Sequence, residues 1–268
     1  MSVQTLYTAA TGMQAMETKL DVIANNLANV NTTAFKRGRA NFEDLFYKQE
    51  VLPGAQDQSG GITATGTAIG LGAKVQSVQT DFQQGAFLTT DNTFDVAIAG
   101  KGFFQVQDTD GTTVYTRSGN FSINAQGQLV MGSASVGRLV QGGDITIPIE
   151  AEDVTITAEG EVLYSEAGSN DLQSAGNLEL AMFIDPEGLE KMGENLYRET
   201  IASGTAATAT PGQDGTGYVR QGMLEASNVS PVAELIELIT TQRSFELNSQ
   251  AVQAGDQILQ LVSNLRRY

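Results

Sequence analysis

The stretch LYTAATGMQAMETKLDVIANNLANV, residues 6–30, has the apolar repeat of a coiled coil. Its apolar side chains recur in alternating steps of three and four residues, at Leu6, Ala9, Met13, Met16, Leu20, Ile23, Leu27 and Val30. This spacing predicts a helix that starts near Ser2 or Gln4 and carries an apolar seam along one face. The asparagines around residue 30 are poor helix formers and indicate its end. A seam of this length needs a partner along the whole helix.

The other end of the chain, residues 221–268, offers such a partner. Ser230 is a suitable N-cap and Pro231 a favoured first residue, so a second long helix is predicted to begin there. It carries two apolar seams on nearly opposite sides: Leu238, Phe245, Val252 and Leu259 form one, and Leu247, Ala251, Ala254, Ile258, Leu261 and Leu265 form the other. Pairing with the first helix covers one seam, so the second implies contact between subunits. A simple two-helix hairpin that caps a β domain is the alternative.

These seams define a predicted assembly interface between copies of the chain. Its residues are Leu6, Met13, Met16, Leu20, Ile23, Leu27, Leu238, Phe245, Val252, Leu259, Ile258 and Leu261. The chain is therefore expected to form a homo-oligomer through its two ends.

Composition restricts the chemistry that the chain can perform. The 268 residues include no Cys, His or Trp, which removes thiol nucleophiles, imidazole bases and Cys/His zinc sites. The net charge of −16 lies almost wholly in residues 51–230, without the basic stripe that nucleic acid requires. No run of about 18 apolar residues is present, so we expect no membrane insertion. We also expect no cleaved secretion signal, because polar residues interrupt the first apolar stretch.

The middle of the chain is predicted to be mainly β. Short alternating or β-branched runs are separated by turn residues and favour an antiparallel domain over residues 73–220. The runs are Lys74–Val78, Phe94–Ile98, Phe103–Gln107, Thr113–Thr116, Phe121–Ile123, Gln128–Met131, Ile145–Ile149, Val154–Ile156, Glu161–Tyr164, Leu178–Ile184 and Asn195–Arg198. The predicted fold class is mixed: long N- and C-terminal α-helices that form a coiled coil, with a central mainly-β domain.

The chain is predicted to divide into an inner helical domain, the central β domain and two connecting segments. Residues 1–35 form the N-terminal helix of an inner coiled-coil domain and residues 221–268 its C-terminal helix. Residues 36–72 form a connecting segment, in which Phe35–Tyr47 is an amphipathic continuation and residues 53–72 a long loop or extended hairpin. Residues 202–217 are rich in small residues and predict a second flexible linker.

Motifs that suggest chemistry are weak. The stretch Asp108–Gly111 lacks most ligands of a calcium loop and favours a hairpin turn. The Gly100–Gly102 stretch lacks the spacing of a phosphate cradle and favours a tight turn. Lys36, Arg37 and Arg39 are expected to pair within the assembly, near Glu43 and Asp44. Paired acids such as Glu152/Asp153 and Glu159/Glu161 fit a solvated acidic face better than a glycosidase pair. We therefore predict no catalytic residues, metal site or cofactor.

Four blocks of sequence resemble the bacterial flagellar axial proteins, the rod and hook family. They are Leu20–Lys36 (LDVIANNLANVNTTAFK), Asp95–Val106 (DVAIAGKGFFQV), Tyr115–Val130 (YTRSGNFSINAQGQLV) and the C-terminal signature within Gln221–Gln260. The family usually has glycine where this chain has Ala34. The segment Phe46–Lys74 resembles the extra stretch of the distal rod class within that family.

The resemblance implies a structural subunit, not an enzyme. It implies terminal helices that fold into an inner tube on assembly and a helical polymer that forms the distal rod and transmits motor torque to the hook. Implied partners are other rod and hook subunits and the surrounding basal-body ring proteins. The implied location is the rod across the periplasm, reached by type III export without cleavage. Alternatives are a proximal rod or hook-type subunit, an extracellular adhesin or scaffold, and a carbohydrate hydrolase that uses paired acids.

Overall fold

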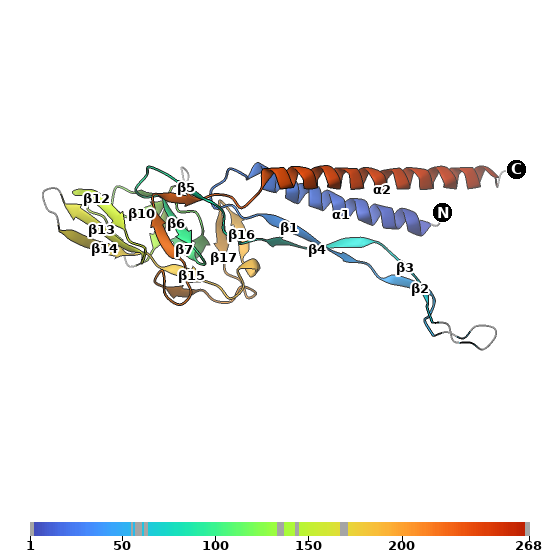
Figure 1. The fold of residues 1–268 in the computed structure, drawn as a ribbon, viewed down its shortest axis with the longest axis horizontal. Coiled ribbons are helices and arrows are strands. Elements are labelled where there is room, and N and C mark those ends of the chain that lie inside the picture. The colour runs from blue at the N-terminus through green and yellow to red at the C-terminus, as the bar shows by residue number, and fades with distance from the viewer. Residues whose placement is uncertain are drawn as a thin grey trace. The chain divides into compact units, whose positions relative to one another are not determined.

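A computed structural model of the chain describes residues 3–54, 56, 61, 64–132, 137–142, 145–166 and 171–265. The chain divides into two compact units. Unit 1 contains Met1–Ala28, Gly38–Thr80 and Ser230–Tyr268, and unit 2 contains Asn29–Arg37 and Asp81–Val229. Two helices at the chain ends flank a mainly-β region, which confirms this part of the predicted fold class (Figure 1). That the helices form a coiled coil stays a prediction.

Two long helices dominate unit 1. Helix α1 (Val3–Ala28) begins and ends close to the predicted positions, and α2 (Pro231–Leu265) begins at the predicted proline. At about 1.5 Å per residue, α2 is about 50 Å long. The two helices lie side by side, and α1 also packs against two strands of the same unit, β1 and β4 (Figure 1). Helix α1 therefore has neighbours on more than one face. No described helix combines the length and the apolar character needed to cross a membrane.

An extended β ribbon completes unit 1. Strand β1 (Gly38–Asp44) pairs antiparallel with β4 (Ala73–Thr80), and β2 (Tyr47–Val51) pairs with β3 (Thr67–Gly70). The predicted amphipathic continuation over Phe35–Tyr47 is thus wrong, because most of this segment is strand. Alternation of Ala40 and Phe42 with polar neighbours suits a pleated ribbon better than a helix. The long loop or extended hairpin predicted over residues 53–72 lies partly outside the described residues; within it, Thr67–Gly70 forms β3 and pairs with β2.

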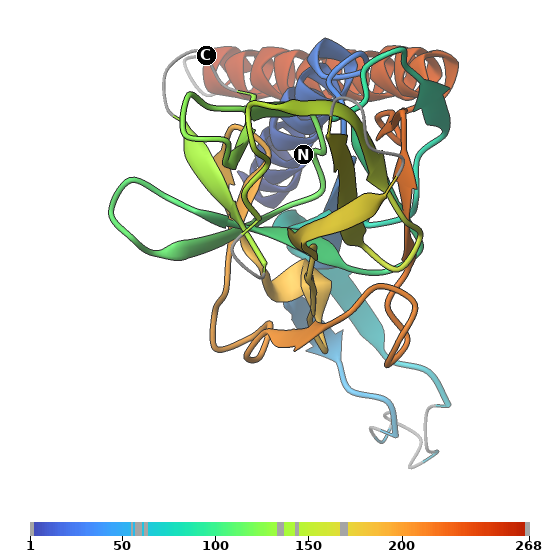
Figure 2. The same ribbon diagram turned by 90° about the vertical axis from the view of Figure 1, so that its left-hand side faces the viewer.

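Unit 2 is built from antiparallel strands. Its largest sheet among the described residues has nine strands, with β7 at a branch point where it pairs with β8, β11 and β15. The nine are β7 (Phe103–Gln107), β8 (Thr113–Thr116), β9 (Phe121–Ile123), β10 (Leu129–Met131), β11 (Arg138–Gln141), β15 (Leu180–Met182), β16 (Glu190–Gly193), β17 (Leu196–Arg198) and β18 (Ala207–Ala209). Figure 2 shows that the strands of this unit run in several directions and do not form one flat layer.

Smaller sheets surround the large one. Strands β12 (Ala151–Ile156), β13 (Glu161–Glu166) and β14 (Leu172–Asn177) form a three-stranded meander. Strand β6 (Val96–Ala99) pairs with β19 (Tyr218–Gln221), and β5 (Phe87–Thr89) pairs with β20 (Met223–Glu225). A short 3-10 helix spans Pro186–Gly188. The predicted antiparallel arrangement is confirmed by every pairing that the structure describes.

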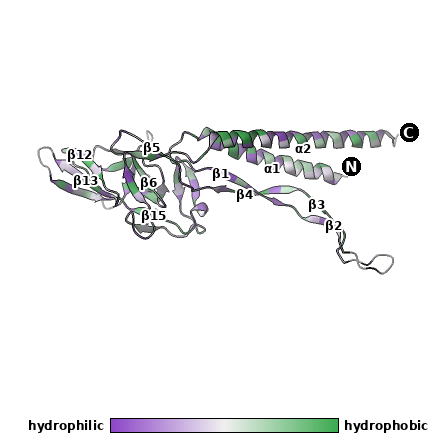
Figure 3. Ribbon diagram, in the orientation of Figure 1, coloured by the Kyte–Doolittle hydropathy of each residue, from purple (hydrophilic) through white to green (hydrophobic). Residues whose placement is uncertain are grey.

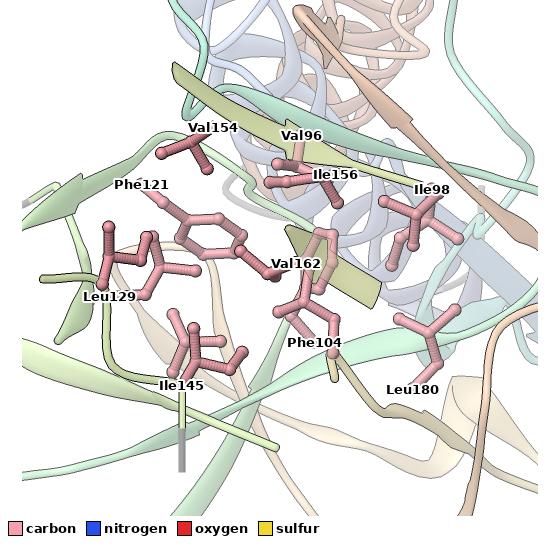
Figure 4. Packing of buried hydrophobic residues seen from close by; sticks show 14 residues of the cluster. Val96, Ile98, Phe104, Phe121, Leu129, Ile145, Val154, Ile156, Val162 and Leu180 are labelled. Carbon is pink, nitrogen blue, oxygen red and sulfur yellow. The ribbon is translucent and has the colours of Figure 1, made fainter. Parts of the chain in front are cut away.

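One apolar core joins these sheets. Phe104 and Phe121 meet edge to face at its centre, with ring centroids 5.0 Å apart and an interplanar angle of 79° (Figure 4). Aliphatic side chains from β6, β12, β13 and β15 surround the two rings: Val96, Ile98, Val154, Ile156, Val162 and Leu180. A second, aromatic cluster contains Phe82, Phe103, Tyr115, Phe183 and Tyr197. Unit 2 therefore has the packed interior of an independent domain.

Two predictions about the β region are wrong. Ile145–Ile149 is not a strand: Thr146 forms an isolated bridge with Gln128, Pro148 has no N–H to donate, and Ile145 and Ile147 fill the core. The predicted linker over residues 202–217 lies wholly inside unit 2 and contains β18. Its turn is closed by a hydrogen bond from Gly212 N–H to the Gly217 carbonyl at 3.0 Å. Small residues therefore mark close backbone packing there and not a connection between units.

Candidate functional site

The predicted interface residues of α1 lie on its packed faces within unit 1. Ile23 is buried, and the other five are partly buried: Leu6, Met13, Met16, Leu20 and Leu27. On α2, Leu238, Phe245 and Val252 are partly buried, whereas Ile258, Leu259 and Leu261 are exposed. The structure thus places part of the predicted set inside one chain and leaves the other part open.

The two helices approach closely at two glycines. A methyl group at Gly255 of α2 would collide with the side chain of Leu6, and one at Gly12 of α1 would lie 3.1 Å from the side-chain nitrogen of Asn248. An ion pair between Lys19 and Glu237, at 2.9 Å, also joins the helices. These contacts fit an intrachain helix pair with a defined register.

A buried amide connects three elements of unit 1. Asn26 on α1 is 1% exposed; its oxygen accepts the N–H of Gly38 at 2.8 Å, and its nitrogen donates to the carbonyl of Gly38 at 2.9 Å. The same nitrogen donates to a carboxylate oxygen of Glu234 on α2 at 3.2 Å. The side chain of Asn26 therefore bonds to both backbone groups of Gly38, as a paired strand would. It links the first residue of β1 to α1 and α2.

An apolar face of α2 stays exposed in the single chain. Near the start of the helix it contains Val232, Leu235, Ile236 and Ile239, and further along Leu247 and Leu261, which are 66% and 63% exposed. Figure 3 shows hydrophobic residues along the length of α2, interspersed with hydrophilic ones. One of the two predicted seams is thus largely covered by α1, and most of the other is uncovered.

The β ribbon of unit 1 also exposes large apolar side chains. Phe46 is 87% exposed, and Tyr47, Val51, Leu52 and Ile69 are exposed beside it. Exposed aromatic and aliphatic side chains in such density mark contact surfaces more often than free ones. The ribbon is therefore a second candidate for contact with another protein surface.

A cluster of buried charged side chains lies in unit 2, around Glu225. One oxygen of its carboxylate accepts from the ammonium of Lys36 at 2.6 Å and from the N–H of Gly85 at 3.0 Å. The other accepts from Arg117 Nε at 3.1 Å and forms an ion pair with the Arg117 guanidinium at 3.0 Å. The side chains of Lys36 and Glu225 are fully buried and that of Arg117 nearly so. We call these three residues the ion cluster.

Hydrogen bonds to the backbone complete the ion cluster. Lys36 donates to the carbonyl of Gln83 at 2.8 Å. Arg117 donates through one terminal nitrogen to the carbonyl of Gly100 at 2.9 Å and to that of Gly102 at 2.7 Å. Removal of any one member would leave buried charges without their partner, which is strongly destabilising.

Burial and neighbouring charges shift the pKa values of Glu225 and Lys36. Burial disfavours the charged form of Glu225, but Arg117 and Lys36 outweigh that effect and lower the pKa of the carboxyl below its ordinary value of 4.5. Burial lowers the pKa of the Lys36 ammonium, against the opposing attraction of Glu225. We infer that Glu225 is ionised at neutral pH.

Sequence reasoning missed the ion cluster. Lys36 was expected to pair near Glu43 and Asp44, but it pairs with Glu225, and Glu43 instead pairs with Lys74 at 2.6 Å. The reason is that β1 carries the Glu43 side of the chain into unit 1, whereas Lys36 belongs to unit 2. Nothing in a single sequence links residues so far apart, so no local signal could have found the cluster.

The turns expected at the weak motifs are present. Asp108–Gly111 connects β7 to β8, closed by a hydrogen bond from Gly111 N–H to the Asp108 carbonyl at 2.9 Å, and Gly100–Gly102 connects β6 to β7. Both glycines of the second turn have positive φ, 120° and 134°. Within the described residues, no three acidic side chains gather as metal ligands would.

Comparisons with known proteins define the class. Residues 6–36 match the family described as flagella basal body rod protein, residues 97–178 the flagellar hook protein FlgE/F/G D1 domain, and residues 220–265 the flagellar basal body rod FlgEFG protein C-terminal. The three matches follow one another along the chain without overlap, and all three describe flagellar rod or hook proteins.

The chain belongs to the flagellar rod and hook family. The flagellar basal-body rod protein FlgG of Caulobacter vibrioides is 46% identical over 98% of this chain and 99% of its own length. The FlgG protein of Agrobacterium fabrum is 41% identical over 95% of this chain and 96% of its own length. The rod protein FlgF of Caulobacter vibrioides is 35% identical over 90% of this chain and 89% of its own length.

Proposed function

We propose that the chain is a structural subunit of the flagellar basal-body rod, in its distal part, and that it catalyses no reaction. The observation that carries this proposal is the near full-length similarity to FlgG rod proteins. In Caulobacter vibrioides the FlgG protein is more similar to this chain than the FlgF protein is, and it covers more of the chain. This difference favours the FlgG type over the FlgF type. The FlgF match makes another rod position the second candidate.

Polymerisation would use the exposed face of α2. The apolar side chains left uncovered by α1, among them Leu247 and Leu261, need a partner of similar character. A second copy of the chain supplies one, and a contact that does not close on itself gives an open helical polymer. Other rod and hook subunits would join this polymer at its ends, and basal-body ring proteins would surround it.

The polymer would act as a rigid drive shaft that transmits motor torque to the hook. The ribbon of β1 to β4, with Phe46 exposed, would restrain sliding between neighbouring subunits. The rod would cross the periplasm, and its subunits would arrive through the flagellar type III apparatus without cleavage.

Electron microscopy of basal bodies from a strain that lacks this gene tests the proposal. We expect structures truncated within the rod and without a hook, and the intact gene supplied in trans should restore both. Complete rods and hooks in the deletion strain would refute the proposal. Truncation at the base of the rod would assign the chain to a proximal position.

A narrower experiment tests the ribbon. Deletion of residues 53–72 should give rods that assemble but are curved or soft, because restraint between neighbours is lost. Straight rods of unchanged stiffness would rule out this role for the ribbon.

A further inference from the structure

Three separate segments of unit 2 lead the chain to or from unit 1. The first is Asn29–Arg37, with a unit boundary at each end; the second begins at Asp81, and the third ends at Val229. Any force applied to one of these segments is applied to unit 2 at that point. What joins the segments inside unit 2 therefore decides whether they respond singly or together.

The three segments are joined directly to one another by hydrogen bonds. The N–H of Asp81 donates to the carbonyl of Arg37 at 2.8 Å. The side chain of Asn228 accepts from the N–H of Arg37 at 2.8 Å and donates to the carbonyl of Asp81 at 2.8 Å. Each segment is thus bonded to both of the others within a few residues of the unit boundary.

Glu225 joins the same three segments a second time. Its carboxylate binds Lys36 of the first segment and Gly85 of the second, and its backbone carbonyl accepts the N–H of Ala34 at 2.8 Å. Through Arg117 it also reaches the turn between β6 and β7 in the body of unit 2. The Glu225 side chain therefore connects all three segments, through Arg117, to the β6–β7 turn.

The backbone at Ala34 is held in an unusual conformation by this arrangement. Its φ of 57° lies in the left-handed region, where a residue with a side chain is less stable than in the right-handed region. Ala34 is fully buried, and Lys36 follows two residues later. The conformation turns the segment so that the Ala34 N–H and the Lys36 ammonium both reach Glu225.

A buried ion cluster is a poor means of adding stability alone, because desolvation offsets most of the attraction between the charges. What the ion cluster does supply is a fixed geometry. Each charge-assisted hydrogen bond requires a narrow range of distances and angles, so the charged groups hold one another in place. An apolar cluster of similar size would allow the three segments to slide, whereas charge-assisted hydrogen bonds fix them.

We propose that Glu225 is a clamp residue that fixes the three connecting segments to one another and to the β6–β7 turn, so that twisting load on one segment is shared by all. This inference rests on the proposed function as a rod subunit, because only a subunit under torque needs such sharing. Glu225 acts here as a positioning residue.

Amide hydrogen exchange on the full-length chain tests the clamp independently of rod function. In the Glu225→Gln variant, protection should fall together at Ala34, Arg37, Asp81 and Gly85. The expected fall is at least about tenfold, as loss of a charge-assisted hydrogen bond implies. Amides of β12 and β13 should stay protected. The matched control is Glu190→Gln, which breaks an exposed ion pair to Arg198 in the same unit.

A second variant guards against simple misfolding. Lys36→Met combined with Glu225→Gln removes one cation and one anion, so the net charge of the cluster is unchanged while the clamp is lost. We expect this variant to fold, because Arg117 keeps its hydrogen bonds to the carbonyls of Gly100 and Gly102, and to show the same joint loss of protection. Unchanged exchange at Ala34 and Asp81, or a change confined to Gly85, would overturn the proposal.

The mechanical part is tested in cells that carry the double variant. Rods and hooks should form, but torsional compliance measured with beads on the hook should rise, and swimming in viscous medium should fail before swimming in dilute medium. Wild-type compliance together with lost protection would overturn the load-sharing role. If deletion of the gene left rods complete, the proposed function would fail, whereas the exchange result would still report on the clamp.

Discussion

Replacement of Asn26 by alanine would test whether one buried amide holds α1, β1 and α2 together. The substitution removes three hydrogen bonds and leaves both backbone groups of Gly38 without their partner inside unit 1. It also takes one donor from the buried carboxylate of Glu234. Alanine favours the helix, so helix propensity does not contribute to the expected loss.

The magnitude follows from the three bonds. Each of the two bonds to Gly38 is worth about 1 kcal/mol, and the bond to the carboxylate about 2 kcal/mol. The total of about 4 kcal/mol is a large part of the roughly 5–15 kcal/mol that stabilises a typical domain. For a unit of roughly 100 residues, this corresponds to a fall in Tm of about 20 °C.

Circular dichroism at 222 nm on the full-length chain is a suitable assay, because both described α-helices lie in unit 1. Loss of the helical signal on heating therefore reports on this unit. The control is Gln14→Ala, at an exposed position of the same helix. If Asn26→Ala and Gln14→Ala melted within about 2 °C of each other, the amide would not hold these elements together, and the reasoning would be refuted.

Three further predictions concern the core, the ion cluster and the open helix face. Phe104→Ala should destabilise unit 2 by about 3–5 kcal/mol in urea unfolding followed by tyrosine near-UV circular dichroism, whereas Phe46→Ala, at an exposed position, should change it by less than about 0.5 kcal/mol; equal effects would contradict the assigned core. Because the pKa of Glu225 is lowered, the stability that wild type holds over Glu225→Gln should be complete above pH 4.5 and should shrink as pH falls below it; a difference that grew as pH fell below 4.5 would exclude an ionic origin. Leu247→Asp should block polymerisation, measured by sedimentation, and leave the Tm of the monomer unchanged, while Gln253→Asp on the same helix should polymerise normally; assembly of the Leu247 variant would remove this face from the interface.

The sequence predicts elements well where one physical signal dominates. The helix starts are set by the heptad repeat and by Ser230–Pro231, and β7, β8 and β9 match their predicted bounds because β-branched and aromatic runs lie between clear turns. Strands such as β14 (LQSAGN) and β18 (ATA) were missed because their residues have little β propensity. Pairing with a neighbouring strand, and not local preference, makes them strands.

The candidate sites also differ in how far the sequence alone reveals them. The two seams of α2 are visible in the sequence, because both follow from helical periodicity. The ion cluster is not visible, because Lys36, Arg117 and Glu225 are brought together only by the tertiary fold. The left-handed conformation of Ala34 is suggested only by the glycine that is usual at this position in the resembled family, since alanine itself gives no local sign of it.

The two helices of unit 1 come from opposite ends of the chain, and this limits how early unit 1 can fold during synthesis. Helix α1 packs against α2, which is the last element of the chain, so the first helix to be made is completed by the last. Contacts between such distant residues close a very long loop and form slowly. While the chain is made from its N-terminus, β1 and β4 can cover part of α1 early, but the side of α1 that faces α2 stays uncovered until α2 has been made.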